Sequence, residues 1–270
     1  MPFAETDGES GTMQAIFITG AASGIGAATA RLFARRGWRV GLADINAAGL
    51  AAVAADCPHS SVYVMDVRDR DGWVAALDAF TGGAGLHVLF NNAGVPSGGP
   101  FEQNEWDAID RTVAINLGGV INGARIGHAY LARTPGSCLL NTASASAIYG
   151  SAGLAVYSAT KFAVRALTEA LDGEWHAQGI KVRGLVPGFI DTPLLDGAVQ
   201  GSNRSIRETV TAAGLELTDV EAVAEAAWDA VHGDRVLAYV GPTAKRLAFA
   251  ARWMPGRLRK RMQRGFAAPD

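Results

Sequence analysis

The sequence predicts a single α/β domain in which helices cover both faces of a doubly wound parallel β-sheet. Short, apolar, β-prone runs alternate with longer helical stretches, and this alternation is typical of parallel strands joined by right-handed crossovers. Hydrophobic residues make up 49% of the 270-residue chain. That share suits strands buried on both faces, and one domain accommodates a chain of this length.

Strands and helices are expected in strict alternation. The strands fall at about residues 15–19, 38–43, 62–65, 86–90, 137–140 and 180–186, and the helices at about residues 27–36, 46–56, 70–80, 105–132 and 154–178. At or just after strand ends lie Gly20, Asp44, Asp66, Asn91, Ser144 and Pro187. Ligands of open parallel sheets bind beyond the carboxyl ends of the strands, so these residues predict one site along one edge.

A glycine-rich turn follows the first strand. Residues 20–26 read Gly-Ala-Ala-Ser-Gly-Ile-Gly and lead directly into the first helix. Glycines permit a tight turn and close backbone approach, while a helix N-terminus offers free N–H groups and a positive dipole to a pyrophosphate. A plain flexible loop is the alternative, but strand, turn and helix together predict the dinucleotide-binding unit of a Rossmann-type fold.

Asp44 bears on the choice of dinucleotide. It follows Gly26 at close to the roughly 20 positions expected of an acid that hydrogen-bonds a ribose hydroxyl. A carboxylate there repels a 2′-phosphate, and neither Ile45 nor Ser23 supplies a compensating cation. The sequence therefore favours NAD over NADP. Asp44 could instead cap the following helix, a role compatible with binding.

Tyr157 and Lys161 are one turn apart in a stretch expected to be helical. Residues at i and i+4 share a helix face, and a nearby positive charge lowers the pKa of a phenol from about 10. We therefore expect Lys161 to bring Tyr157 toward the pKa range of a neutral-pH acid/base catalyst. The spacing alone also fits an interfacial tyrosine beside a solvated lysine, so the decision depends on the companion motifs.

Together these motifs resemble those of the short-chain dehydrogenase/reductase (SDR) family, in its short single-domain branch. The resemblance covers about residues 14–239. It depends on Thr19 to Gly26, Asp66-Val67, Asn91 to Gly94, Asn116, Ser144, Tyr157 with Lys161, and Pro187-Gly188 followed by Thr192. The glycine spacing differs from that of extended-type epimerases, and the Tyr–Lys spacing from that of enoyl reductases.

The resemblance implies two sets of site residues. The catalytic set is Asn116, Ser144, Tyr157 and Lys161. The cofactor-binding set is Gly20, Ser23, Gly24, Ile25, Gly26, Asp44, Ile45, Asp66, Val67, Asn92, Ala93, Gly94, Tyr157, Lys161, Pro187, Gly188, Ile190 and Thr192. No metal is expected, because the five histidines are scattered along the chain.

In such a site, Tyr157 exchanges a proton with the substrate oxygen, Ser144 holds that oxygen, and Asn116 supports a water that connects to the lysine. Taken singly, Ser144 also fits a turn serine and Asn116 a buried amide that kinks a helix. The resulting prediction is an NAD(H)-dependent oxidoreductase that interconverts a secondary alcohol and a ketone. The alternatives are an NADPH-dependent carbonyl reductase and a non-catalytic dinucleotide-binding sensor or scaffold.

Substrate specificity is expected to depend on residues 95–100, 145–153 and 192–217, the last as a lid. These segments supply mainly apolar side chains: Val95, Pro96, Ile148, Tyr149, Leu194, Leu195, Ala198 and Val199. An apolar or aromatic substrate is therefore predicted. Arg204 and Arg207 are the objection, since they fit either a solvated lid face or a site for an acid.

Three segments are expected along the chain: a flexible polar lead at residues 1–12, the NAD-binding and catalytic domain at 13–241, and a basic amphipathic C-terminal extension at 242–270. The extension carries no acid between residues 245 and 264. It fits packing over the substrate opening or on a neighbouring subunit, which we favour, or contact with an anionic membrane. We expect Leu247, Trp253, Met254 and Leu258 to be covered by the same or a neighbouring subunit.

Partners and compartment follow from simpler features. The resemblance implies a homotetramer or homodimer built on the helices at residues 105–132 and 154–178. A formal net charge of −2 gives no reason to expect nucleic acid. Two cysteines without zinc-like spacing, and no apolar run of membrane-spanning length, indicate a cytoplasmic protein.

Overall fold

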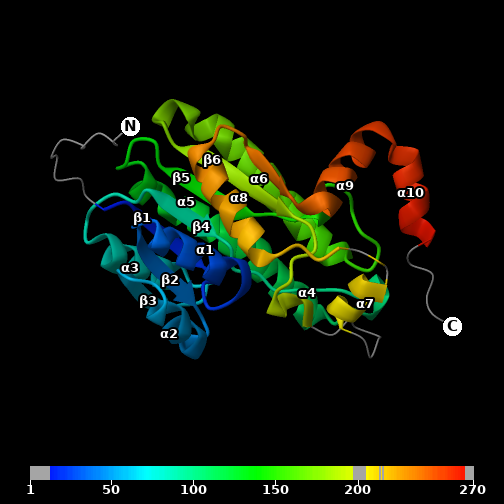
Figure 1. Cartoon of the computed structure of the whole chain (residues 1–270), viewed down its shortest axis with the longest axis horizontal. Coiled ribbons are helices and arrows are strands. Elements are labelled where there is room, and N and C mark those ends of the chain that lie inside the picture. The colour runs from blue at the N-terminus through cyan, green and yellow to red at the C-terminus, as the bar shows by residue number, and fades with distance from the viewer. Residues whose placement is uncertain (1–12, 197–204, 213, 215, 265–270) are drawn as a thin grey trace, which may run out of the picture.

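The computed structural model describes residues 13–196, 205–212, 214 and 216–264; the lead expected at residues 1–12 lies outside them. Within this part of the chain, seven strands form one parallel sheet in the order β3-β2-β1-β4-β5-β6-β7 (Figure 1). The strands are β1 Ala15–Thr19, β2 Arg39–Asp44, β3 Ser60–Val64, β4 Val88–Asn91, β5 Cys138–Thr142, β6 Lys181–Pro187 and β7 Leu237–Val240. The sheet order reverses between β1 and β4, so the predicted doubly wound Rossmann-type α/β domain is confirmed.

Helices cover both faces of the sheet. One face carries α1 Gly24–Arg35, α2 Ala47–Ala55 and α8 Val220–His232; the other carries α3 Arg70–Thr81, α5 Val120–Leu131 and α6 Ala155–Trp175. Successive side chains of β1 alternate between the two faces, so Ile16 and Ile18 join the first core and Ala15 and Phe17 the second. All four are buried, as expected of a central strand in a two-faced sheet.

The helix predicted at residues 105–132 is interrupted. It consists of α4 Trp106–Val113, a π-helical turn η2 Ala114–Gly119, and α5. Asn116 lies in this turn with no exposed surface. π-turns inside α-helices occur frequently at functional sites, because the widened turn redirects side chains. The second long helix, α6, continues into the short 3-10 helix η4 His176–Gln178.

Some elements lie outside the predicted set. Helix α8 and strand β7 were not expected, and β3 begins earlier than predicted. As an edge strand, β3 leaves Val62 and Val64 exposed. Short 3-10 helices η1 Phe101–Gln103, η3 Ala145–Ala147 and η5 Pro193–Asp196, together with α7 Ile206–Ala212, complete the loops at the carboxyl ends of the strands.

The C-terminal extension folds as two helices, α9 Gly241–Trp253 and α10 Pro255–Arg264, which extend beyond the body of the domain (Figure 1). Leu258 is buried as expected, and Leu247 and Met254 are half-buried. Trp253, however, is 65% exposed, so the chain itself does not cover it, and its cover by a neighbouring subunit stays a prediction. No helix among the described residues combines the length and apolarity needed to cross a bilayer.

Candidate functional site

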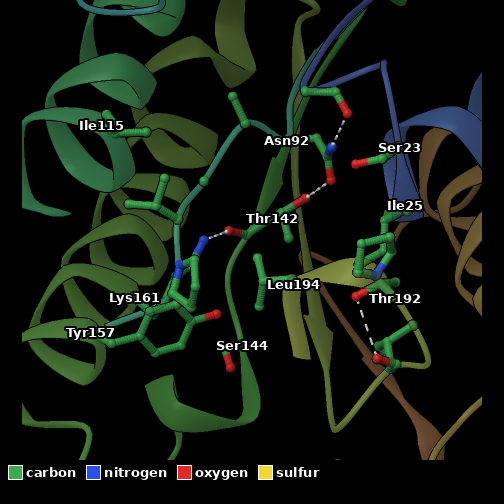
Figure 2. Close-up of a pocket in the computed structure, with 18 of the residues that line it drawn as sticks. Ser23, Ile25, Asn92, Ile115, Thr142, Ser144, Tyr157, Lys161, Thr192 and Leu194 are labelled. Atoms are coloured by element: carbon green, nitrogen blue, oxygen red, sulfur yellow. Dashed lines mark hydrogen bonds between the residues drawn. The ribbon is translucent and has the colours of Figure 1, made fainter. Parts of the chain in front are cut away.

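A cavity of about 390 Å³ lies along the carboxyl ends of the strands, at the point where the sheet order reverses (Figure 2). Every predicted site residue except Gly26 and Asn116 lines it. Those lining residues are Gly20, Ser23, Gly24, Ile25, Asp44, Ile45, Asp66, Val67, Asn92, Ala93, Gly94, Ser144, Tyr157, Lys161, Pro187, Gly188, Ile190 and Thr192. Residues from distant parts of the chain therefore form one site.

The glycine turn brings the first helix directly onto the end of β1. Gly20 has a φ of +66°, and a Cβ on Gly26 would lie 2.2 Å from the Gly20 carbonyl oxygen, so neither position accommodates a larger residue. Ser23 is the N-cap residue of α1, yet its side chain makes no capping hydrogen bond. Its hydroxyl and the first-turn N–H groups are therefore open to the cavity, and they fit a pyrophosphate.

Asp44 fixes the edge of the cavity. Its Oδ2 accepts a hydrogen bond from the Ala22 N–H at 3.2 Å, and its Oδ1 accepts one from the Asn46 N–H at 3.0 Å. The first bond ties the end of β2 to the glycine turn. The alternative that Asp44 caps α2 was wrong, because Asn46 caps it by accepting from the Gly49 N–H.

Beyond Asp44, a forked ion pair borders the cavity. Arg68 Nε lies 3.0 Å from Asp66 Oδ1, and Arg68 Nη2 lies 2.5 Å from Asp66 Oδ2. Hydrogen bonding from Arg68 lowers the pKa of Asp66, so this carboxylate is an ionised acceptor. Arg68 lines the cavity but was missed by sequence reasoning, which had only its position beside the Asp66-Val67 pair as a signal.

A chain of hydrogen bonds connects the glycine turn to the helix that carries Lys161 (Figure 2). Asn92 Nδ2 donates to the Thr19 carbonyl at 3.1 Å, and Thr142 Oγ1 donates to Asn92 Oδ1 at 3.1 Å. Lys161 Nζ donates to the Thr142 carbonyl at 2.8 Å. Thr142 was not predicted as a site residue; it is the last residue of β5 and joins the two halves of this network.

Tyr157 and Ser144 meet on the same wall of the cavity, and the Tyr157 hydroxyl points toward Ser144 in Figure 2. Burial raises the pKa of Tyr157, and a hydrogen bond with Ser144 acts in the opposite direction. Ser144 is itself oriented, since its Oγ accepts a hydrogen bond from the Ser146 N–H at 3.1 Å. The two hydroxyls therefore lie together at one point of the cavity wall.

The expected effect of Lys161 on Tyr157 needs correction. Burial lowers the pKa of Lys161 to about 8, and its Nζ donates to the Thr142 carbonyl, 5.7 Å from the centre of the Tyr157 ring. Burial outweighs other effects at Tyr157, so its pKa is raised rather than lowered. The i, i+4 spacing predicted proximity correctly, but it could not predict how little water reaches either group.

Asn116 acts on a neighbouring loop. Its Oδ1 accepts from the Val95 N–H at 2.8 Å and its Nδ2 donates to the Val95 carbonyl at 3.0 Å. A Cβ on the adjacent Gly94 would lie 3.3 Å from Asn116 Oδ1 and 3.7 Å from Lys161 Nζ. Asn116 thus holds residues 94–95 beside Lys161; its connection to Lys161 through a water stays a prediction.

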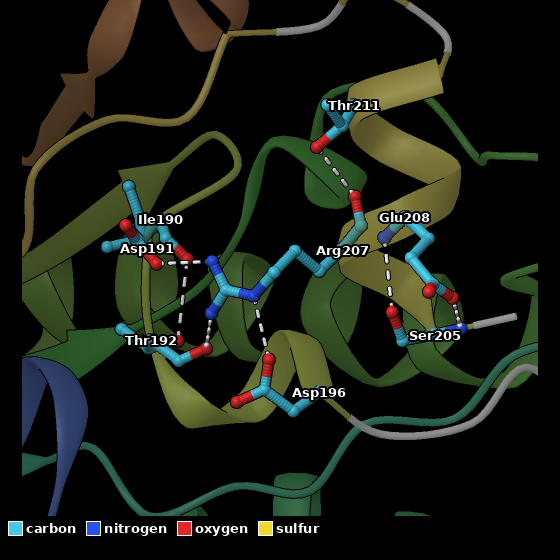
Figure 3. Close-up of polar contacts among 8 residues, drawn as sticks. All are labelled: Ile190, Asp191, Thr192, Asp196, Ser205, Arg207, Glu208 and Thr211. Atoms are coloured by element: carbon cyan, nitrogen blue, oxygen red, sulfur yellow. Dashed lines mark hydrogen bonds and ion pairs between the residues drawn. The ribbon is translucent and has the colours of Figure 1, made fainter.

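Arg207 makes unexpected contacts in the segment that was expected to form a lid (Figure 3). It donates hydrogen bonds to the carboxylate of Asp191, to Asp196 Oδ1 at 2.7 Å and to the Thr192 carbonyl at 3.1 Å. Both interpretations of Arg207 were therefore incomplete: its guanidinium is neither simply solvated nor free to receive an acid. Instead it ties α7 to the loop that carries Thr192. Arg204, Ala198 and Val199 lie outside the described residues.

The part of the cavity lined by residues 95–96, 154, 189 and 193–195, here called the substrate half because a substrate is expected there, is mostly apolar. Its lining includes Val95, Pro96, Leu154, Phe189, Leu194 and Leu195. Two residues expected there, Ile148 and Tyr149, do not line it; Ile148 packs instead into a core with Val164 and Val186. Arg111 was missed, and it lines both this cavity and a neighbouring one of about 220 Å³.

This chain is similar to known dehydrogenases along most of its length. Residues 14–203 match the family model of the short chain dehydrogenases. The chain is 34% identical over 185 residues to the 2,5-dichloro-2,5-cyclohexadiene-1,4-diol dehydrogenase of Sphingobium indicum, covering 66% of this chain and 73% of that protein. It is 35% identical over 181 residues to the 3-alpha-(or 20-beta)-hydroxysteroid dehydrogenase of Mycobacterium tuberculosis, covering 66% and 70%.

Among solved structures, the 3-ketoacyl-(acyl-carrier-protein) reductase of Brucella melitensis, complexed with NADH, has a TM-score of 0.76 at 28% identity. The match covers 86% of this chain and 98% of that chain. The chain belongs to the short chain dehydrogenase family and is an oxidoreductase of that family. The similar solved structure holds a nicotinamide dinucleotide, NADH.

Proposed function

We propose that this chain is an NAD(H)-dependent oxidoreductase that interconverts a secondary alcohol and a ketone. The observation that carries the proposal is the meeting of the Tyr157 and Ser144 hydroxyls, beside Lys161, in the cavity that the glycine turn borders. An acid/base group and a nucleotide cradle in one cavity are what hydride exchange at a carbinol carbon requires.

The residues around the cavity divide by the part of the nucleotide that each would hold. The glycine turn with Ser23 suits the pyrophosphate, Asp44 and Lys161 suit ribose hydroxyls, and Asp66 with Val67 suits the adenine. Asn92, Ala93 and Gly94 would hold the adenosine side, and Pro187, Gly188, Ile190 and Thr192 the carboxamide end. When bound, the nicotinamide supplies the chemistry of accepting or donating a hydride.

Tyr157 is the proposed proton-exchanging group. In alcohol oxidation its Oη accepts the hydroxyl proton, and in ketone reduction it donates that proton to the substrate oxygen. Ser144 hydrogen-bonds the same oxygen and fixes its position. Because burial raises the pKa of Tyr157, the phenol form predominates at neutral pH in the free protein and suits the reductive direction.

Asp44 supports NAD as the preferred nucleotide. Its carboxylate is fixed by two backbone N–H groups at the edge of the cavity, where it would accept from a ribose hydroxyl and repel a 2′-phosphate. Ile45, the next residue, is 67% exposed and uncharged. An NADPH-dependent carbonyl reductase is the second candidate, and Arg68 at the adenine end of the cavity is the observation that favours it.

The substrate is proposed to be an apolar or aromatic alcohol or ketone. The mostly apolar lining of the substrate half offers little charge to pair with a carboxylate or phosphate, apart from Arg111. The two related dehydrogenases act on a chlorinated cyclohexadiene diol and on hydroxysteroids, which are cyclic alcohols. Both observations favour a ring-bearing secondary alcohol.

A homodimer or homotetramer built on the long helices is part of the proposal. Helix α6 exposes a row of small side chains, namely Ala155, Ala159, Ala166 and Ala170, which allow close approach of another helix. Ile121 of α5 and Phe162 of α6 are exposed as well. Light scattering that finds only the mass of a single chain at micromolar concentration would contradict this assembly.

The test is a panel of cyclic, aromatic and aliphatic secondary alcohols, each offered with NAD⁺ and with NADP⁺, with reduced nucleotide followed by absorbance. We expect turnover of at least one apolar alcohol and a higher kcat/KM with NAD⁺. A preference for NADP⁺ would favour the carbonyl reductase. Tight nucleotide binding without turnover of any alcohol or corresponding ketone would favour the sensor or scaffold.

A further inference from the structure

Two exposed aromatic surfaces of this chain carry opposite charge. The first, the tail surface, lies on α9 and α10. Phe249 is 59% exposed and Trp253 is 65% exposed, and they are one helical turn apart on the same face of α9. The exposed cations of the two helices are Lys245, Arg246, Arg252, Arg257, Arg259, Lys260 and Arg261. None of these cations has an ion-pair partner within the described residues.

The second, the α4 surface, lies on η1 and the start of α4. Phe101 is 60% exposed and Trp106 is 76% exposed. Around them lie four exposed carboxylates: Glu102, Glu105, Asp107 and Asp110. In the part of the chain that the structure describes, none of the four is ion-paired. Exposed aromatic side chains grouped with unpaired charge are typical of a surface that another molecule covers.

We propose that the tail surface of one copy docks on the α4 surface of a second copy. The two surfaces match in kind, since each presents two aromatic side chains, and they are opposite in charge. The exposure of Trp253 and Trp106 shows that the chain's own body covers neither. Because every copy carries both surfaces, a two-fold arrangement would satisfy both at once.

An anionic membrane would account for only one of the two exposed surfaces. It would attract the tail surface, but it would repel the α4 surface and leave Phe101 and Trp106 uncovered. A second copy accounts for both surfaces with one contact. This docking adds a contact to the assembly proposed on α5 and α6, and it does not require the chain to be an enzyme. If it occurs, it brings one copy's tail beside the other's cavity, because Arg111 of α4 lines that cavity.

Interchain disulfide trapping tests the proposal. The chain's two cysteines, Cys57 and Cys138, are buried, so an introduced surface cysteine reacts selectively. Gly256 and Gln103 are exposed beside the two surfaces, and a Cβ on Gly256 meets nothing within 4 Å. A Gly256→Cys chain and a Gln103→Cys chain, carrying different tags, are co-expressed and mildly oxidised. Circular dichroism checks that both variants are folded.

We expect the mixed disulfide to exceed that of a control pair by about tenfold, since docking raises the effective concentration of the two thiols. The control combines Gln103→Cys with Arg235→Cys, an exposed residue at the other end of the sheet, just before β7. Adding Arg257→Glu and Arg261→Glu to the tail should return cross-linking to the control level. Glu105→Lys and Asp107→Lys in the other chain should then restore it.

Cross-linking equal to that of the control pair would overturn the proposal, as would cross-linking that charge reversal does not change. Sedimentation of the protein with phosphatidylglycerol vesicles, together with control-level cross-linking, would assign the tail surface to a membrane instead. Turnover of alcohols is a separate measurement, so failure of this proposal leaves the proposed function untouched.

Discussion

The two halves of the cavity are built differently. In the nucleotide half, groups at the ends of β1, β2, β4 and β5 hydrogen-bond one another, as Asp44 does with the Ala22 N–H and Thr142 with Asn92. In the substrate half, the lining is mostly apolar and comes mainly from loops. In the part of the chain that the structure describes, the Arg207 side chain on α7 hydrogen-bonds the loop carrying Thr192, where the two halves meet.

This difference indicates that the geometry of the nucleotide half is fixed, whereas the side chains of the substrate half can be exchanged. Each internal hydrogen bond of the nucleotide half contributes about 1 kcal/mol, and its partners lie on separate strands, so the half is preorganised for one ligand shape. Apolar loop side chains impose no such geometry and can be exchanged without leaving a buried polar group unsatisfied. We therefore expect the strand ends to determine which cofactor binds, and the loops to determine which substrate binds.

The largest effect is expected from removing the acid/base group that lies between the two halves of the cavity. Tyr157→Phe should lower kcat by about 10²- to 10⁴-fold, the range that acid/base catalysis contributes, while NADH affinity stays nearly unchanged. Steady-state kinetics and NADH fluorescence titration measure the two quantities. If both fall together, Tyr157 belongs to the nucleotide half and the separation between the halves is wrong.

A change of cofactor preference tests the nucleotide half alone. Asp44→Ser with Ile45→Arg should shift the ratio of kcat/KM values toward NADP by about 10- to 100-fold, because a repulsive carboxylate is replaced by a cation that pairs with a 2′-phosphate. Relative rates among alcohols should stay constant. Ile45→Arg alone is the control, with a smaller shift expected; a reordered alcohol preference would show that the halves are coupled.

Ser144→Ala tests how the Tyr157 pKa is set. The Ser144 hydrogen bond opposes the effect of burial, so its removal raises the Tyr157 pKa further. Alcohol oxidation requires the phenolate, so the pH at which the oxidation rate increases should be higher in the variant. Ketone reduction requires the phenol, so its rate should persist to higher pH. We also expect about a tenfold loss of kcat/KM from the lost contact to the substrate oxygen.

Ser146→Ala is the matched control for that measurement. Ser146 lines the same cavity, and the alanine variant keeps the backbone N–H that donates to Ser144 Oγ. Its pH profile should therefore equal that of the unaltered protein. An unmoved profile in Ser144→Ala would contradict the role of Ser144 in setting the Tyr157 pKa.

The smallest effect is expected from replacing Arg207, which connects α7 to the loop that carries Thr192. Arg207→Gln should raise the KM for NAD about fivefold at most, since exposed ion pairs contribute little individually. Arg207→Lys should recover part of the loss, and kcat should change less than KM. A lower melting temperature with unchanged KM would show that Arg207 stabilises the lid without positioning Thr192.

Local patterns carried much of the prediction. The glycine turn, the strand end at Asp44 and the Tyr157–Lys161 spacing are properties of adjacent residues or of one helix turn, and the structure has them where they were expected. Strand β3, in contrast, ends at Val64, two residues before Asp66. Strands and helices alternate along the sequence, as in parallel sheets with right-handed crossovers, so the fold class was predictable as well.

Features that depend on contacts between distant segments were not predictable. The π-turn at Asn116 accompanies two hydrogen bonds to Val95, and the pairing of Arg207 with Asp191 needs the lid's tertiary course. The direction of the Tyr157 pKa depends on burial, which spacing does not report. Trp253 shows the same limit, since an amphipathic pattern predicts an apolar face but not what covers it.

Label transfer tests the central claim most directly. A secondary alcohol from the panel, deuterated at its carbinol carbon, is incubated with NAD⁺ and the unaltered protein, and the products are analysed by mass spectrometry and NMR. The account predicts one deuterium on C4 of the reduced nicotinamide for each ketone formed, and almost none of either product with Tyr157→Phe. Ketone formed without label on the nucleotide, or equal transfer by Tyr157→Phe, would contradict it.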